Sequence, residues 1–257
     1  METVQSVRPA GVVSHIRRSG RMTAGQQRAW ALLWPRLGRS LDDLAPGPID
    51  LDGWFGRTAP VVLEIGSGMG ESTSRLASTA PEVNHLAAEV YPAGLGQLML
   101  WADRLNLQNL RLIDGDAVNL LQDHLAPDSL AGVRIYFPDP WPKKRHHKRR
   151  LVTPGFVALV ASRLAPGATL HLATDWADYA DRMLEVCSAE SLLRNRFATE
   201  PGGWAPRPDW RPLTKFESRA QAEGRVCRDL VFDKRPTGSV TEARTRSPGF
   251  GRFPGTS

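Results

Sequence analysis

Between residues 61 and 232, short apolar runs alternate with segments of helical periodicity. Alternation at this spacing predicts a mainly parallel sheet with helices on both faces. The expected strands are 61–65, 85–90, 110–114, 133–137, 168–173 and 226–232. The expected helices are 71–78, 93–105, 153–164 and 177–188, with another inside 22–37 that ends near Pro35. Such sheets bind ligands at the carboxyl ends of their strands, so we expect the chemistry just after each strand.

The two ends of the chain differ in composition from this central region. Residues 1–20 contain arginines without a clear pattern, which predicts a mobile basic arm. Residues 236–257 are rich in Gly, Ser, Thr, Arg and Pro and poor in apolar side chains, which predicts a disordered tail. Residues 42–60 are rich in Pro, Gly and Asp and are expected to form a connector. We therefore expect one domain over residues 21–235.

The positive charge of the chain is concentrated in two segments. Residues 1–40 hold seven arginines against one acid, and residues 143–150 (KKRHHKRR) hold six Lys/Arg and no acid. Since the net charge is +6, the remaining residues together carry −6. Two basic patches on an acidic body favour directed contact with a polyanion. A solvated arm and a solvated loop are the alternative.

Several classes of protein are disfavoured by what the sequence lacks. It contains no apolar run near the ~20 residues of a membrane span and no apolar core of a secretory signal at its start. The two cysteines, Cys187 and Cys227, show no CxxC spacing, which argues against disulfides and zinc. His146 and His147 lack a third ligand nearby. We expect a cytoplasmic protein without a membrane partner or a metal; monomer and homodimer stay open.

A glycine-rich loop follows the first expected strand, at residues 64–70 (EIGSGMG). Glycines such as Gly66 and Gly68 permit a tight turn and let backbone amides approach a ligand. The GxGxG spacing differs from the dinucleotide pattern GxGxxG. Glu64 lies inside the strand, where burying a carboxylate is costly unless it meets a cation or hydrogen-bond donors. S-adenosylmethionine offers an ammonium and a sulfonium, which favours this cofactor.

Acids also follow the next two expected strands. Glu89 is placed to accept both ribose hydroxyls of a nucleoside cofactor. In the sequence DGDA, Asp116 is a better acceptor for the exocyclic amine of adenine than Asp114 is. Glu89 as a helix-start charge and Asp114 as a turn residue are the alternatives. Because three successive strand ends carry acids, a methyltransferase is favoured over a nicotinamide dehydrogenase.

The fourth expected strand runs into the sequence FPDPWPKKRHHKRR, residues 137–150. A proline favours extended backbone in the residue before it, so Asp139 should be a stiffly held, pre-organised acid. Trp141 and the cations after it predict recognition of RNA bases and phosphates. A localisation signal or a solvated loop is the alternative for the basic run.

These motifs, with Glu89, Asp116, ATD at 173–175 and TKFE at 214–217, resemble the bacterial tRNA (guanine-N7-)-methyltransferases over about residues 18–234. The resemblance implies an α/β, class I S-adenosylmethionine-dependent methyltransferase fold, Rossmann-like, with a seven-stranded, mostly parallel sheet and helices on both faces. It also implies methyl transfer to N7 of guanosine 46, in the variable region of tRNA. The long C-terminal tail is not explained by the family pattern.

The resemblance also assigns residues to three sites. The residues that match cofactor positions are Glu64, Glu89, Asp116 and Asp139. Those that match substrate positions are Lys143, Asp175, Thr214, Lys215, Phe216 and Glu217. Those that match the RNA-contacting stretch are Arg145, His146, His147, Lys148, Arg149 and Arg150. Thr214 and Glu217 also have the spacing of a capping box, which is an alternative role for both.

Guanine N7 carries an in-plane lone pair, so no base has to remove a proton before methyl transfer. We therefore expect catalysis by alignment and by carboxylates that stabilise positive charge arriving on the purine. Asp139, with Asp175, is the candidate for charge stabilisation, and Glu217 could accept from guanine N1–H and its amino group. A non-catalytic RNA-binding protein with a decayed methyltransferase fold stays open as a second class.

Overall fold

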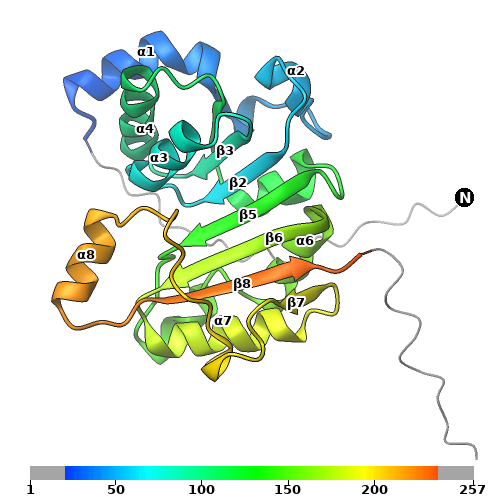
Figure 1. The fold of residues 1–257 in the computed structure, drawn as a ribbon. Helices are drawn as coiled ribbons and strands as arrows, with labels where there is room; N and C mark the ends of the chain where they lie inside the picture. The colour runs from blue at the N-terminus through cyan, green and yellow to red at the C-terminus, as the bar shows by residue number, and fades with distance from the viewer. Residues whose placement is uncertain (1–20, 237–257) are drawn as a thin grey trace, which may run out of the picture.

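A computed structural model describes residues 21–236, so the expected arm at 1–20 and the tail from 237 onward lie outside the described residues. The described chain forms one sheet in the order β1-β4-β3-β2-β5-β6-β8-β7 (Figure 1). Neighbours from β1 to β6 are parallel, and β8 runs antiparallel to β6 and β7. The strands are β1 Gly38–Ser40, β2 Val61–Ile65, β3 Asn84–Glu89, β4 Leu110–Asp114, β5 Leu130–Tyr136, β6 Leu164–Thr174, β7 Leu193–Asn195 and β8 Arg228–Lys234.

The predicted mainly parallel sheet is confirmed, with eight strands in place of seven. The strands that the sequence analysis did not predict are β1 and β7, each three residues long. A run of three residues is too short to show the period-2 pattern that identifies a strand. β1 pairs with β4 and extends the sheet at one edge.

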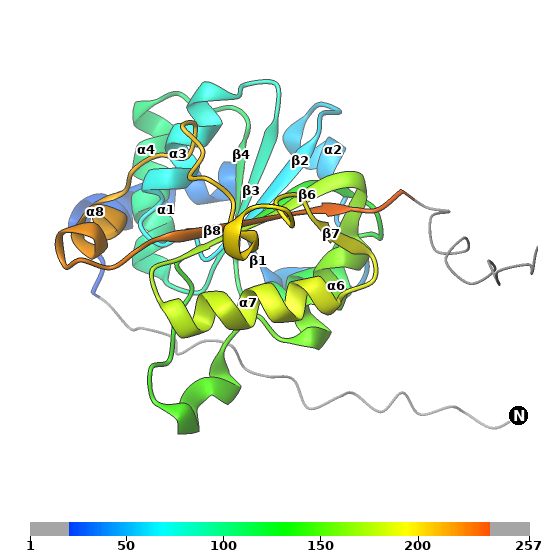
Figure 2. The ribbon, with the colours of Figure 1, turned by 60° about the horizontal axis from the view of Figure 1, so that its bottom comes forward.

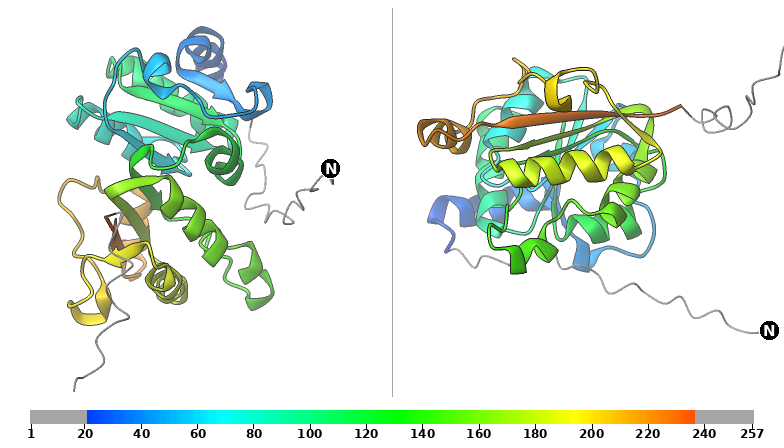
Figure 3. Two further views of the ribbon diagram at one scale, coloured as in Figure 1. Left: turned by 90° about the vertical axis from the view of Figure 1, so that its right-hand side faces the viewer. Right: turned by 90° about the horizontal axis from the view of Figure 1, so that it is seen from below.

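Helices cover both faces of the sheet, as predicted (Figures 2 and 3). The longer ones are α1 Ala24–Leu37, α3 Glu71–Thr79, α4 Pro92–Arg104, α6 Pro154–Arg163, α7 Ala177–Ala189 and α8 Lys215–Ala222. The shorter ones are η1 Leu41–Asp43, α2 Leu51–Phe55, α5 Ala117–Asn119, η2 Leu120–His124, η3 Lys144–Arg149 and η4 Pro201–Gly203.

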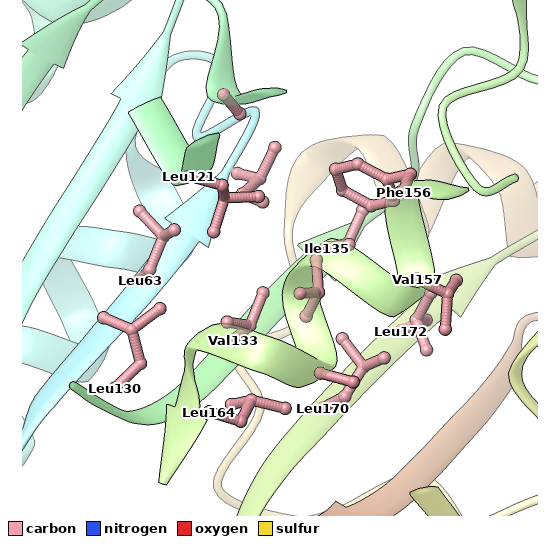
Figure 4. Close-up of a cluster of buried hydrophobic side chains, with 14 of the residues drawn as sticks. Leu63, Leu121, Leu130, Val133, Ile135, Phe156, Val157, Leu164, Leu170 and Leu172 are labelled. Carbon is pink, nitrogen blue, oxygen red and sulfur yellow. The ribbon is translucent and has the colours of Figure 1, made fainter. Parts of the chain in front are cut away.

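Two hydrophobic clusters fill the space between the sheet and these helices. Ala87 and Leu112 belong to the cluster beneath α1, α3 and α4, whereas their neighbours Leu86 and Ile113 belong to the other. Because successive side chains of a strand point to opposite faces, central strands that are buried on both faces read as continuous apolar runs. Figure 4 shows part of the larger cluster, where strand residues meet Phe156 and its neighbours.

The element boundaries near prolines and connectors differ in part from those expected. α1 continues two residues past Pro35, since a proline in the last turn removes only one backbone donor. The segment 42–60 is not only a connector: it contains α2, which Asp50 caps by accepting from the amide of Gly53 at 2.9 Å. α6 begins after Thr153, the predicted N-cap, whose side chain accepts from Phe156 N.

The register of the parallel strands aligns their carboxyl ends. Ile65 pairs with Ala88 on one side and Ile135 on the other, and Glu89 pairs with Asp114. The loops that follow β2, β3, β4 and β5 therefore meet at one edge of the sheet, where the chemistry was expected.

Candidate active site

The carboxyl ends of β2, β3, β4 and β5 open into a pocket of about 600 Å³. This volume is within the range of small-molecule sites in proteins. One wall includes the residues that the sequence analysis assigned to a cofactor: Glu64, Gly66, Gly68, Glu89 and Asp116. The other wall includes Phe137, Asp139, Thr214, Lys215 and Phe216. The fold thus brings residues from six separate segments of the chain to one cavity, since Arg149 and Leu151 also line it.

The glycine loop after β2 adopts a conformation that side chains would not fit. Gly66, Gly68 and Gly70 have φ values of 76°, 55° and 74°. A Cβ added at Gly70 would lie 2.6 Å from Cδ1 of Leu98, and one added at Gly94 would lie 2.3 Å from the carbonyl oxygen of Gly68. Helix α4 therefore packs directly against the loop, whose backbone borders the pocket.

Glu89 connects this loop to the end of β3 and the start of α4. Its Oε2 accepts from Gly68 N at 2.7 Å, and its Oε1 accepts from Val90 N at 2.8 Å and Tyr91 N at 3.1 Å. Tyr91 is the N-cap residue of α4. The helix-start role considered from the sequence is thus present, and Glu89 also lines the pocket.

Glu64 is a buried carboxyl group in the wall of the pocket, 5% exposed. Burial raises its pKa to about 7, although the positive charge of Arg134 offsets part of the rise. Among the described residues, its Oε2 has no hydrogen-bond partner. A buried carboxylate oxygen without a donor fits a ligand that brings a cation or an N–H group, such as the ammonium of S-adenosylmethionine.

Asp116 follows β4 and caps the short helix α5. Its carboxylate accepts from Val118 N at 2.7 Å, and it lines the pocket beside Gly115. Glu64, Glu89 and Asp116 thus lie along one wall, in or just after three adjacent strands. The set fits a nucleoside cofactor with a cationic end.

The segment after β5 departs from the extended backbone that the sequence predicted. Phe137 and Trp141, each followed by a proline, have φ values of 52° and 46°. The expectation that the prolines hold them extended is therefore wrong. Left-handed backbone costs about 1–3 kcal/mol in a residue other than glycine, so surrounding contacts must impose it. Phe137 N donates to Ala173 O at 2.8 Å, and its ring lies 5.3 Å from that of Phe216. Asp139 is exposed at the pocket.

The basic run folds into η3, next to the pocket. The side chains of Lys143, Arg145, Lys148 and Arg149 are exposed, and those of His146 and His147 are half-buried. Arg149 and His146 both lie against the ring of Trp141, at 5.0 Å and 5.9 Å. This aromatic and cationic surface has the character expected of an RNA contact.

Arg150 is an exception within this run, because it is only 4% exposed. Its Nη2 donates to both carboxylate oxygens of Asp178, at 2.8 Å and 3.1 Å, and its Nε donates to Pro140 O at 2.8 Å. The expectation that Arg150 contacts RNA is corrected: its guanidinium is buried and anchors the loop to α7.

The TKFE motif forms the start of α8. Thr214 is the N-cap and accepts from Glu217 N at 3.3 Å, which is half of the predicted capping box. Lys215 N donates to Oε2 of Glu71 at 3.1 Å, across the mouth of the pocket. Phe216 is 56% exposed and faces Phe137.

Three expected substrate residues are not among those that line the pocket: Lys143, Asp175 and Glu217. The carboxylate of Glu217 is fully buried and accepts from Arg211 at 2.7 Å and 2.9 Å and from Arg207 at 2.9 Å. The expectation that Glu217 accepts directly from guanine is therefore wrong for this structure, since arginines already occupy both oxygens. Asp175 is 10% exposed and accepts from Arg225 at 2.7 Å.

Sequence reasoning missed the polar residues that lie behind the pocket. Tyr136 Oη lies 2.9 Å from Nδ1 of His171, whose Nε2 lies 2.7 Å from Oδ1 of Asp229. Arg211 donates to the second oxygen of Asp229 at 2.9 Å. These residues lie far apart in the sequence and share no motif, so no sequence signal marks them as a group.

Within residues 21–236, no helix is both long and apolar enough to cross a membrane. In the same range, no three His, Cys, Asp or Glu side chains are grouped so that they could hold a metal ion. The absence of a metal site stays a prediction.

Comparison with protein families matches residues 58–230 to a family described as "Putative methyltransferase". The tRNA (guanine-N(7)-)-methyltransferase of Streptomyces coelicolor is 53% identical over 216 residues, which cover 84% of this chain and 78% of that protein. The enzyme of the same name from Bordetella pertussis is 52% identical over 221 residues, which cover 86% of this chain and 84% of that protein.

Among solved structures, the 16S rRNA methyltransferase KamB superposes with a TM-score of 0.51 at 16% identity, and the match covers 77% of this chain and 99% of KamB. This likeness concerns the fold alone. The fold is that of the class I methyltransferases, as the sequence implied.

Proposed function

Since this chain belongs to the tRNA (guanine-N(7)-)-methyltransferase family, we propose that it transfers a methyl group from S-adenosyl-L-methionine to N7 of guanosine 46 in the variable region of tRNA. The observation that carries the proposal is the shared pocket. The acids and glycines of the cofactor side and the TKFE segment of the substrate side border one cavity.

On the cofactor side, Glu64, Glu89, Asp116 and the backbone at Gly66 and Gly68 would hold S-adenosylmethionine. When bound, this cofactor supplies a methyl group made electrophilic by its positively charged sulfur. The buried Oε2 of Glu64, which has no donor within residues 21–236, supports this assignment. Glu89 accepts from Gly68 N and so orders the glycine loop. Because it also lines the pocket, the remaining lone pairs of its carboxylate would bind the ribose.

On the substrate side, the enzyme has to align N7 with the methyl group but has no proton to remove from it. Thr214, Lys215 and Phe216 line the pocket and would orient the guanine. Asp139 is the proposed catalytic residue, because an exposed carboxylate at this wall would stabilise positive charge arriving on the purine. Asp175 is a second candidate for stabilising this charge. Its ion pair with Arg225 would have to break before its carboxylate could face the substrate.

The proposed partner is tRNA, bound in the cytoplasm by the basic surface beside the pocket. The residues that would contact its phosphates are Lys143, Arg145, His146, His147, Lys148 and Arg149. Residues 21–235 would form the catalytic domain. The arginines before residue 21 would add charge of the same sign.

The activity is tested by incubating the protein with bulk tRNA and S-adenosylmethionine that carries a labelled methyl group. Digestion of the tRNA to nucleosides is expected to yield label in 7-methylguanosine. Binding of tRNA without transfer would instead favour the decayed, non-catalytic class. Affinity for a nicotinamide cofactor, with none for S-adenosylmethionine, would favour a dehydrogenase.

A further inference from the structure

Arg211 is among the largest fully buried side chains of the protein, at 2% exposure. It lies in the segment between η4 and α8. Its two terminal nitrogens donate to Glu217 at 2.7 Å and 2.9 Å, and Nη2 also donates to Asp229 at 2.9 Å. A buried guanidinium needs such partners, because an unpaired buried charge is strongly destabilising. Arg211 thereby joins the first turn of α8 to strand β8.

The same network continues from Asp229 across the sheet. The other oxygen of Asp229 is hydrogen-bonded to Nε2 of His171 on β6, and Nδ1 of His171 is hydrogen-bonded to the hydroxyl of Tyr136 on β5. Tyr136 lines the pocket. One partner of Arg211, Asp229, is therefore held by a chain of hydrogen bonds that runs over three neighbouring strands, β8, β6 and β5.

Arg211 also lies directly behind the aromatic wall of the pocket. Its guanidinium carbon is 5.7 Å from the ring centroids of both Tyr136 and Phe137. The ring of Phe137 in turn contacts that of Phe216, which immediately precedes Glu217 in α8. Holding Glu217 in place therefore holds Phe216 against Phe137.

Within residues 21–236, Arg207 also donates to Glu217, at 2.9 Å and 3.3 Å, but α8 itself buries few side chains. Its buried residues are Glu217 and Ala220. Figures 1 and 2 show α8 beside the carboxyl ends of β5 and β6, linked to the body by an extended segment at each end. A helix of eight residues is not stable alone, so its position has to come from anchors. The outer anchor, Lys215 N to Glu71, is a single exposed hydrogen bond, whereas Arg211 donates two buried ones to Glu217.

We propose that Arg211 is a positioning residue for methyl transfer: through Glu217 it places Thr214–Phe216 against the end of β5. This inference rests on the proposed function and assigns Glu217 the same indirect role. Loss of Arg211 should leave the glycine loop, Glu89 and Asp116 intact. It should therefore impair the substrate side while leaving the cofactor side in place.

The test compares Arg211→Met with Arg196→Met. Arg196 pairs with Asp233, near the other end of β8, and does not line the pocket. It is a control for the loss of an arginine ion pair in an exposed position, since its side chain is 47% exposed. Cofactor affinity is measured by calorimetry. The single-turnover rate is measured at saturating cofactor and tRNA, beside a melting curve.

We expect Arg211→Met to keep the cofactor affinity of the wild type and to lose about 10²-fold in single-turnover rate, the order found when reacting groups are misplaced by about 1 Å. Arg196→Met should lower Tm by less than Arg211→Met does, because its ion pair is partly exposed, and should not lower the rate. Arg211→Lys keeps the positive charge but loses the planar guanidinium that bonds two oxygens at once. Its single-turnover rate should therefore lie between that of Arg211→Met and that of the wild type. A wild-type rate in Arg211→Met, or an equal loss in the control, would overturn the proposal.

Two further measurements separate positioning from folding. In Arg211→Met, Glu217 keeps Arg207 as a donor, whereas Oδ2 of the buried Asp229 loses Arg211. Adding Asp229→Asn removes that buried charge, so Tm should recover while the rate stays low; recovery of both would overturn the proposal. Hydrogen exchange of the amides at 214–218 should rise in Arg211→Met, with no change at 66–70. This readout needs no tRNA. An inactive wild type would therefore reject the proposed function, whereas unchanged exchange would reject the role of Arg211.

Discussion

The amide of Gly68 donates a 2.7 Å hydrogen bond to Oε2 of Glu89, although the two residues are 21 positions apart. The bond ties the loop after β2 to the end of β3, on the wall of the pocket. The second oxygen accepts from two amides at the start of α4. One carboxylate therefore orders the two backbone segments between which a cofactor would bind.

Glu89→Gln should weaken S-adenosylmethionine binding. An amide side chain has one acceptor oxygen in place of two, so at least one loop amide loses its partner. Loss of a hydrogen bond to a charged group costs about 1.5–3 kcal/mol, or roughly ten- to a hundredfold in Kd. Calorimetry measures the change. Glu190→Gln is the control, since Glu190 also accepts a backbone amide but does not line the pocket. Wild-type affinity in Glu89→Gln would remove this residue from the cofactor site.

The affinity for S-adenosylmethionine should rise with pH because of Glu64. Burial raises its pKa to about 7, so the carboxyl is mostly neutral at pH 6 and mostly ionised at pH 8. Only the ionised form attracts an ammonium, and each pH unit below the pKa should weaken binding by up to about tenfold. In the free protein the sign is opposite: this group's contribution to stability falls as pH rises from 4.5 toward 7.

Calorimetry at pH 6, 7 and 8 measures this dependence, and Glu64→Gln should flatten it. If affinity does not depend on pH in the wild type, the ammonium does not face Glu64.

Neutralising Lys143, Arg145 and Lys148 together should weaken tRNA binding and flatten its salt dependence. Each phosphate contact that is lost lowers the slope of log K against log salt by about 0.7–0.9. Arg150→Met is the matched control from the same run. Its guanidinium is buried against Asp178, so it should lower Tm and leave the slope unchanged. An unchanged slope in the triple variant would show that the exposed cations do not contact tRNA.

Asp139→Asn should lower kcat while tRNA affinity and Tm stay close to those of the wild type. Asp139 is exposed, the change is nearly isosteric, and one electrostatic contact to the transition state is typically worth about 10²–10³ in rate. Single-turnover rates and a melting curve distinguish this role from one in which Asp139 braces the turn. A normal chemical step together with a lowered Tm would assign Asp139 to the turn.

The strands and the glycine loop were predictable because local patterns encode them. β2 and β4 have the predicted bounds. An apolar run marks a buried strand, and a glycine or an acid directly after it marks the carboxyl end, where ligands bind. The left-handed backbone at Phe137 was not predictable, because it is imposed by Ala173 and Phe216 from other elements. The family motif marked Glu217, but only the fold reveals that arginines enclose it.

The buried state of Arg150 has the same kind of cause. Within the sequence it is the last of six cations, and its role depends on Asp178, 28 residues later. Arg211, His171 and Asp229 likewise meet only because β6 and β8 are neighbours. Sequence patterns thus locate the pocket, whereas long-range ion pairs decide which charged residues can reach a ligand.

The central claim is tested most directly with two unmodified tRNA transcripts that differ only at position 46, one with G and one with A. After incubation with methyl-labelled S-adenosylmethionine, borohydride and aniline cleave the chain wherever guanine carries a methyl group on N7. We predict incorporation of label only into the G46 transcript, with cleavage at that position. Equal labelling of the A46 transcript, or label in the G46 transcript without cleavage at position 46, would contradict the proposed function.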